Sequence, residues 1–469
     1  IYGSRASNGV IIITTKQGKA GKDKITLSAN YGVSKIPKLV DMMGAKDFVS
    51  FVNEAYIDEG QAPLYPNVDS ILAITGPDGT NWQEEIFQTG HYSDFNVAFA
   101  GGNDNMTYRV SGNIVDQKGV VLNSSYKRYQ SNVNLTKKIG ERLKMGLNLN
   151  IARYVREPSS SVNLGTTAGW KSSMLTLPPT MPARNPDGSP SSFNPIAYFG
   201  GGVVNTSLAS AEMITAQTTY NDLLGSVYLQ YKILDGLHFK SSLGVNLGNS
   251  NYHSYVPSYM PSNVASGAEF GNARTDIGFK DYLLNENTLV YDKSFGEHNL
   301  NLLGGFTFQT SESNTVGLGG GGLTNDIIQW NSFESVPQEQ RNISSAYSLN
   351  KQLSYIGRAQ YNYANKYYLT FTTRYDGASN FAANKKWGFF PSSAIKWRVS
   401  EEDFFKDLAI SKNILTDLSI RGSYGVSGNQ GISNYQSLPT LSVDANAYVF
   451  GGVPYLGYKQ GNITNDNLS

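Results

Sequence analysis

The residue types most often used for metal binding are rare in this sequence and widely separated. Its four histidines are His91, His238, His253 and His298, and none has a second histidine at the spacing of a metal-binding pair. Cysteine is absent, which excludes thiolate metal sites, disulfides and cysteine nucleophiles. We therefore predict neither a bound metal nor a cofactor.

Motifs for nucleophilic or acid–base catalysis are also missing. The nearest approach to a Gly-x-Ser-x-Gly nucleophile turn is Gly425 to Gly428, and its spacing does not fit. Acidic residues are scattered, and no pair stands out as the two carboxylates of a glycosidase. The glycines near the N-terminus, Gly3 and Gly9, are not followed by the Gly-Lys-Ser/Thr of a phosphate-binding loop. We therefore expect that the protein is not an enzyme.

Aromatic residues in the predicted loops are the remaining candidates for ligand contact. Their flat rings can stack on sugars or pack against a protein partner. They can instead hold loops against one another or lie at a membrane interface, and we favour that role. The set comprises Trp170, Tyr198, Phe199, Tyr252, Tyr255, Tyr259 and Trp330.

The elements that position these residues are predicted strands with two unlike faces. Between Leu143 and Ile151, one face carries leucine, methionine and isoleucine, whereas the other carries lysine, glycine and asparagine. The same alternation recurs along the chain and predicts about 13 strands, many of about 10 residues, the length that crosses a bilayer. Only residues 41–60 have clear helical spacing, with a shorter helical turn expected at 400–405.

Connections between the predicted strands alternate between short and long. Short turns at 101–105, 138–141, 234–236, 292–298 and 364–366 alternate with longer segments at 116–126, 155–218, 250–275 and 310–346. Outer-membrane β-barrels have short turns at one rim and long loops at the other. The last of these loops contains four consecutive glycines, Gly319 to Gly322, which predict a mobile or very tight segment.

The composition is typical of a barrel with a wet interior. The polar faces carry Asn, Thr, Ser, Arg and Lys, and the chain has 30 Tyr, a residue type that favours membrane interfaces. The net charge of +1 gives no electrostatic reason to expect nucleic acid as a partner. We therefore predict an all-β, transmembrane antiparallel β-barrel in contact with outer-membrane lipid. A soluble all-β protein with one solvated sheet face remains the alternative.

Three stretches of the sequence resemble the SusC/RagA family of TonB-dependent outer-membrane transporters. Residues 1–18 are similar to the end of that family's plug domain, just before the first barrel strand. Residues 374–402 are similar to its mid-barrel signature, and residues 421–430 to a further family motif. Residues 465–469 look like the start of another motif, which ends in Trp-Glu. The stretches occur in family order, so the resemblance covers the whole chain.

The resemblance singles out a small set of positions. In the plug motif, glycines allow tight turns that precede a short apolar strand at 10–13. The matching plug residues are Gly3, Ser4, Arg5, Asn8 and Gly9, and the matching barrel residues are Arg374, Asp376, Gly377, Phe381, Pro391, Gly428 and Asn429.

The family also implies an architecture and a function. A complete barrel would have about 22 strands. Residues 1–20 would form the C-terminal end of a plug, and residues 21–469 a partial barrel with long extracellular loops. The chain begins without an initiator methionine or signal peptide, so we expect a fragment cut at both ends.

The implied function is TonB-dependent import of glycans or peptides across the Gram-negative outer membrane. A SusD-like surface lipoprotein and the TonB–ExbB–ExbD complex would be the partners. The alternatives are a passive porin-like channel and a soluble all-β glycan-binding protein.

Overall fold

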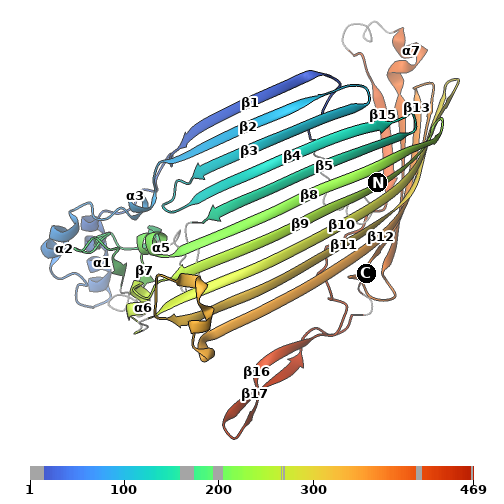
Figure 1. Cartoon of the computed structure of the whole chain (residues 1–469). Helices are drawn as coiled ribbons and strands as arrows, with labels where there is room; N and C mark the ends of the chain where they lie inside the picture. Colours follow the sequence, from blue (N-terminus) through green and yellow to red (C-terminus); the bar gives the residue numbers. More distant parts are fainter. Residues whose placement is uncertain are drawn as a thin grey trace.

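The computed structural model describes residues 15–158, 174–193, 204–265, 267, 270–407, 415–465 and 468. Its main element is one sheet of 13 strands, in the order β1-β2-β3-β4-β5-β8-β9-β10-β11-β12-β13-β14-β15 (Figure 1). Neighbouring strands in this order pair antiparallel. The prediction of about 13 antiparallel strands is confirmed.

The strands of this sheet differ greatly in length. They are β1 (Gly21–Ser34), β2 (Gly90–Gly102), β3 (Met106–Lys118), β4 (Ser125–Ile139), β5 (Leu143–Glu157), β8 (Thr215–Leu234), β9 (Leu237–Val256), β10 (Gly271–Phe295), β11 (His298–Leu323), β12 (Arg341–Tyr363), β13 (Tyr367–Ala378), β14 (Trp387–Arg398) and β15 (Ser419–Gly425). With 25 and 26 residues, β10 and β11 far exceed the about 10 residues that cross a bilayer. The predicted connections at 250–275 and 310–346 are therefore wrong in their bounds, because these strands continue into them.

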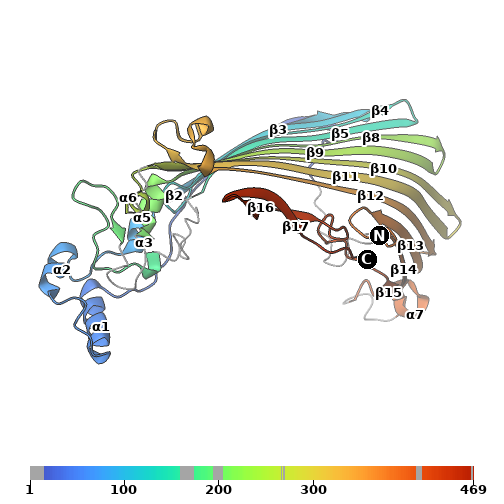
Figure 2. The same ribbon diagram turned by 90° about the horizontal axis from the view of Figure 1, so that it is seen from below.

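The pairing register joins the apolar faces of neighbouring strands into one surface. Leu147 of β5 lies opposite Val227 of β8, which lies opposite Leu243 of β9. These side chains are 36%, 38% and 40% exposed, respectively. Figure 2 shows that the sheet is curved; the segment preceding β1 runs along its concave side, where Gly18 contacts the polar face. The apolar face is therefore convex, and such a face suits hydrocarbon better than water.

The two rims of the sheet differ as the loop lengths predicted. Tight turns join β4 to β5, β8 to β9 and β10 to β11, and they contain Gly140, Gly236 and Gly296 with φ of 60°, 84° and 58°. These left-handed values favour glycine, which has no Cβ to clash. The opposite rim carries the long connections and most helices, whereas α7 lies at the short-turn rim (Figure 1).

The helices are short except for one. They are α1 (Ala45–Asp58), α2 (Val68–Thr75), α3 (Trp82–Ile86), α5 (Ser207–Met213), α6 (Pro261–Ala265) and α7 (Asp403–Lys406). The structure confirms the helix predicted at 41–60 and the helical turn at 400–405, where η6 (Val399–Glu401) precedes α7. The sequence patterns missed α2, α3 and α5, which are too short for a clear period but begin after the capping side chains Asn67, Asn81 and Thr206. No helix within the described ranges is both long enough and apolar enough to span a membrane.

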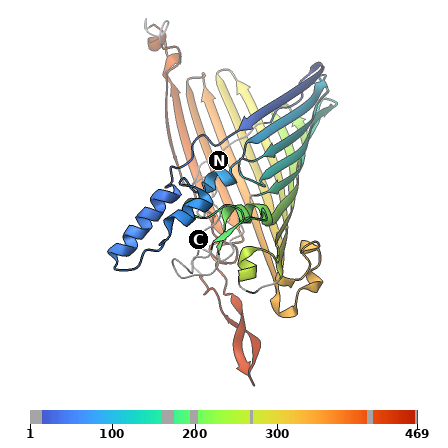
Figure 3. The ribbon, with the colours of Figure 1, turned by 90° about the vertical axis from the view of Figure 1, so that its left-hand side faces the viewer.

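The sheet is an open trough. Its edge strands, β1 and β15, stand apart in Figure 3 and do not pair with each other. Two smaller hairpins lie outside the main sheet: β6 (Ser192–Phe193) with β7 (Val204–Asn205), and β16 (Leu441–Phe450) with β17 (Val453–Gln460). Figure 2 shows the second of these on the concave side.

The first three of the four consecutive glycines lie in regular strand rather than in a loop. Gly319 to Gly321 continue β11, so the expected mobile or tight segment is wrong for these residues; Gly322, near the end of the strand, has a φ of 84°. A Cβ on Gly320 would lie 2.6 Å from the Val336 side chain of the β11–β12 loop. Glycine is needed here because the loop packs directly on the strand backbone.

Candidate functional site on the concave face

A ladder of neutral amides and a hydroxyl lies on the concave face of β4, β5 and β8, next to Arg109 of β3. Asn150 donates a hydrogen bond to Asn132, and Asn134 donates one to Asn148. The amide of Asn148 in turn donates to the Ser226 hydroxyl at 3.2 Å. These residues sit directly opposite one another in the register, so the polar ladder crosses the three strands β4, β5 and β8. The predicted polar interior thus consists here of groups that can both donate and accept hydrogen bonds.

The chain entering β1 is docked on this ladder. The backbone N–H of Gly18 donates to the Asn134 side-chain oxygen at 3.4 Å. A Cβ on Gly18 would lie 2.4 Å from the carbonyl oxygen of Tyr108, a backbone atom that cannot move aside easily. Beside this contact, a cavity of about 680 Å³ is lined by Thr15, Lys16 and the amide ladder. We call this region the junction site.

The plug-motif residues Gly3, Ser4, Arg5, Asn8 and Gly9 lie outside the described residues. The junction site therefore begins two residues after the apolar run at 10–13 that follows the motif. Gly18 is the last residue of the stretch 1–18 that resembles the plug, although no motif position singles it out. The only signal for Asn134 is that it falls on the polar face of an alternating strand.

The two barrel motifs converge around a second, smaller cavity. Arg374 and Asp376 form an ion pair at 3.0 Å on the concave face of β13, and their side chains are 17% and 6% exposed. Asn380 donates to the backbone carbonyl of Gln430 at 3.1 Å, which fastens the second motif to the third. The resulting cavity of about 210 Å³ includes Asp376, Phe381, Gly428 and Asn429 in its lining. We call it the motif cavity.

Two motif residues act on the sheet itself rather than on the cavity. A Cβ on Gly377 would lie 2.9 Å from the Trp387 ring, which stacks on Tyr375 with ring centres 4.8 Å apart. The carbonyl of Pro391 accepts a hydrogen bond from Val426 at 2.9 Å, where β15 leaves β14. Gly377 and Pro391 therefore have structural roles in the sheet: one makes room for the Trp387 ring, and the other bonds the chain that leaves β15.

The end of the mid-barrel signature anchors the short-turn rim. The Glu402 carboxylate accepts hydrogen bonds from Tyr367, Trp397 and Lys366 at 2.5, 3.0 and 3.1 Å. These donors lower the pKa of Glu402 to about 2, so the carboxylate stays ionised in neutral and mildly acidic solution. One carboxylate thereby ties the β12–β13 turn to the connection that follows β14.

Four of the seven aromatic loop candidates lie within the described residues; of these, Tyr252 lies in β9 and Tyr259 is exposed. Trp170, Tyr198 and Phe199 lie outside the described residues. Tyr255 is 2% exposed, and Trp330 stacks on His253 with ring centres 5.3 Å apart.

Tyr255 and Trp330 belong to a cluster that packs the β11–β12 loop against the ends of β9, β10 and β11, together with Ala273, Leu323, Val336 and Phe333. In this arrangement both aromatic residues hold the β11–β12 loop against the sheet.

Asp326, which no sequence pattern indicated, joins the β11–β12 loop to the β9–β10 loop. Its carboxylate accepts hydrogen bonds from the Tyr255 hydroxyl at 2.7 Å and from the backbone and hydroxyl of Ser258 at 2.8 and 2.6 Å. Burial raises the pKa of Asp326, but the hydrogen bonds from Ser258 and Tyr255 lower it by more, so the net pKa lies below its ordinary value. An ionised carboxylate thus clamps the two loops.

We expect Asp326→Ala to loosen both loops in the full-length receptor. The substitution leaves the buried Tyr255 hydroxyl without its partner, a loss of about 1.5–3 kcal/mol for hydrogen bonds to a charged group. The backbone N–H groups of Tyr255, Val256 and Ser258 should exchange with deuterium roughly 10- to 150-fold faster. The exposed neighbour Thr324→Ala is the control and should leave exchange unchanged. Equal exchange in the wild type and Asp326→Ala would refute the clamp.

The geometry and the comparisons together define the class of protein. A curved antiparallel sheet with an apolar convex face, a polar concave face and unequal rims is the wall of an outer-membrane-type β-barrel. No family model matches the chain. It is 33% identical over its whole length to TonB-dependent receptor P3 of Formosa agariphila and 30% identical over 97% of its length to TonB-dependent receptor SusC of Bacteroides thetaiotaomicron.

Similarity in sequence and structure to known proteins also identifies the family. The chain spans 44% and 45% of those two relatives. The RagAB peptide transporter structure matches the whole chain with a TM-score of 0.83 at 23% identity, over 53% of its own length. The chain belongs to the SusC/RagA family of TonB-dependent receptors, and the predicted fold class is confirmed.

Proposed function

We propose that the receptor containing this chain imports a polar nutrient, a glycan or a peptide, across the outer membrane with energy supplied through TonB. The observation that carries the proposal is the junction site, where the chain leading into β1 lies across the concave wall. In this proposal, residues 1–20 are the end of a plug and residues 21–469 are part of the barrel. A passive pore has no need of such an internal segment.

The chemistry of the concave wall supports this class of cargo. Asparagine and serine side chains exchange hydrogen bonds with hydroxyl and amide groups and carry no net charge. Glycans and peptides offer those groups in abundance. The relatives named SusC and RagAB, the second called a peptide transporter, support the same choice and a SusD-like lipoprotein as the partner at the long-loop rim.

The proposed mechanism is gating. Cargo and TonB must bind one plug state better than another, because a ligand with equal affinity for two states shifts neither. A change in the state of the plug would be transmitted to the barrel wall at the junction site, because the chain leading into β1 contacts the wall there. The three strands that hold it, β3, β4 and β5, are joined by ordinary ladder pairing and so offer a rigid surface for docking.

The test is cargo uptake by cells that carry the full-length receptor, with and without functional TonB. We expect uptake of labelled oligosaccharide or peptide to fall to the level of a receptor-free strain when TonB is removed. Uptake that persists without TonB would favour a passive porin-like channel. Partition of the receptor into the aqueous phase without detergent would favour a soluble glycan-binding protein.

A further inference from the structure

A hollow interrupts the apolar convex face of β1 to β5. Its volume is about 790 Å³, within the range of about 300–1,000 Å³ typical of small-molecule sites. The floor is open because small residues face outward at its centre: Gly112 lies opposite Ser131, and a Cβ on Gly112 would meet only Val97, at 3.7 Å. The apolar residues around it are Leu27, Phe95, Val97, Ile114, Tyr129 and Ile151.

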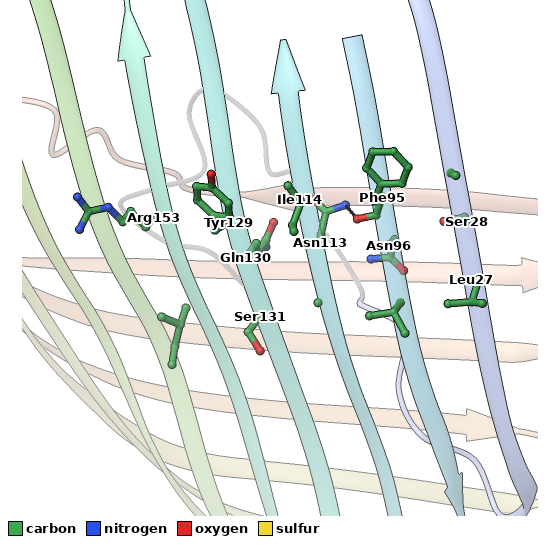
Figure 4. Close-up of a pocket in the computed structure, with 14 residues that line it drawn as sticks. Leu27, Ser28, Phe95, Asn96, Asn113, Ile114, Tyr129, Gln130, Ser131 and Arg153 are labelled. Carbon is green, nitrogen blue, oxygen red and sulfur yellow. Dashed lines mark hydrogen bonds between the residues drawn. The ribbon is translucent and has the colours of Figure 1, made fainter.

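One end of the hollow carries a positive charge. Phe95, Ile114, Tyr129 and Arg153 form a row across four neighbouring strands (Figure 4). Arg153 is exposed, lines the hollow, and makes no hydrogen bond or ion pair with any other described residue. By contrast Lys127, the next outward residue after Tyr129, lies 4.0 Å from Asp116. The uncompensated charge at this end is therefore that of Arg153.

The position of Arg153 along its strand fixes its depth in the bilayer. In β5 the outward side chains are apolar from Leu143 to Ile151, and Arg153 is the next outward residue toward the long-loop rim. An arginine at the edge of an apolar band lies at the level of lipid headgroups, where its charge stays hydrated. The hollow beneath it faces the acyl chains.

We propose that this hollow binds an anionic lipid, with its phosphate on Arg153 and an acyl chain over Gly112 and Ser131. Charge complementarity selects this occupant, because an uncompensated guanidinium pairs with phosphate, whereas an apolar hollow accepts hydrocarbon. The lipid would belong to the leaflet on the long-loop side. This inference needs only that the convex face meets the bilayer and is independent of the cargo.

The experiment uses the full-length receptor in detergent, stripped of lipid and then incubated with dioleoylphosphatidylglycerol or dioleoylphosphatidylcholine. Native mass spectrometry counts the lipid retained. We expect the wild type to retain more phosphatidylglycerol than phosphatidylcholine. Arg153→Gln should lower the retention of phosphatidylglycerol about 5-fold. This is the roughly 1 kcal/mol that one basic residue contributes near anionic lipid. Gly112→Leu should lower retention of both lipids because the new side chain fills the hollow.

Two matched variants serve as controls. Lys118→Gln removes a positive charge near the same rim outside the hollow, and Gly304→Leu adds the same bulk at an outward glycine with nothing within 4 Å. Both should retain lipid as the wild type does. The proposal is overturned if Arg153→Gln keeps the anionic preference or if Gly112→Leu keeps both lipids. Receptor dimers in place of lipid-bound monomers would assign the hollow to a second copy and overturn it too.

Discussion

Asp376→Ala should destabilise the receptor more than any other single change considered. The Asp376 side chain is 6% exposed and pairs with Arg374 at 3.0 Å. Removing one partner of a buried pair leaves the other charge uncompensated, which costs about 3–5 kcal/mol. The measurement is the free energy of unfolding of the full-length receptor in detergent, obtained from its denaturant unfolding curve.

Two further variants separate this effect from a general loss of charge. Replacing both partners, Arg374→Met with Asp376→Leu, should recover most of the lost stability, because neither charge is then left buried alone. Asp116→Ala breaks an exposed pair of 4.0 Å on the same sheet and should cost no more than about 1 kcal/mol. If Asp376→Ala and Asp116→Ala lower the free energy of unfolding by the same amount, the Arg374–Asp376 ion pair does not stabilise the fold.

Gly18→Val should lift the entering chain from the wall. The first atom of the new side chain would lie 2.4 Å from the Tyr108 backbone oxygen, and the hydrogen bond from Gly18 to Asn134 would be lost as the segment shifts. Overpacking of this kind costs about 1–3 kcal/mol. Since 1.4 kcal/mol is about a factor of ten in an equilibrium, the undocked state would become roughly 5- to 150-fold more populated.

The readout for Gly18→Val is ion conductance of the full-length receptor in planar bilayers. We expect open events to become more frequent, because the segment no longer holds its place inside the wall. Gly32→Val is the matched control, since a Cβ on Gly32 of β1 meets nothing within 4 Å. An unchanged conductance for Gly18→Val, together with normal uptake, would show that the junction site does not hold the plug.

The sequence predicted the wall of this protein well, for a physical reason. A strand between lipid and water needs apolar and polar residues in strict alternation, and that pattern is visible wherever it occurs. The strand count and the unequal rims followed from it. The lengths of β10 and β11 did not, because beyond the bilayer both faces meet water or loops and the alternation has no cause to persist.

The sites were only partly predictable. The family motifs indicated Asp376 and Asn429, which do line one cavity. Asn134 and Asp326 were missed because their roles depend on partners 116 and 68 or more positions away. A single asparagine or aspartate carries no mark of a distant partner in its own neighbourhood.

The neighbour-by-neighbour pairing of the sheet has a consequence for how the protein is made. Every strand of the wall pairs only with the strands adjacent to it in the sheet order, and all but one of the joining connections link strands that follow directly in sequence. Loop closure is then inexpensive at most steps, so the wall can grow largely by adding one hairpin at a time. The exceptions are the two long connections, from β1 to β2 and from β5 to β8, which are nearly equal in length and should be the slowest to close. Until the edge beyond β1 is paired, its free backbone groups are a template for aggregation, so the growing sheet needs protection there.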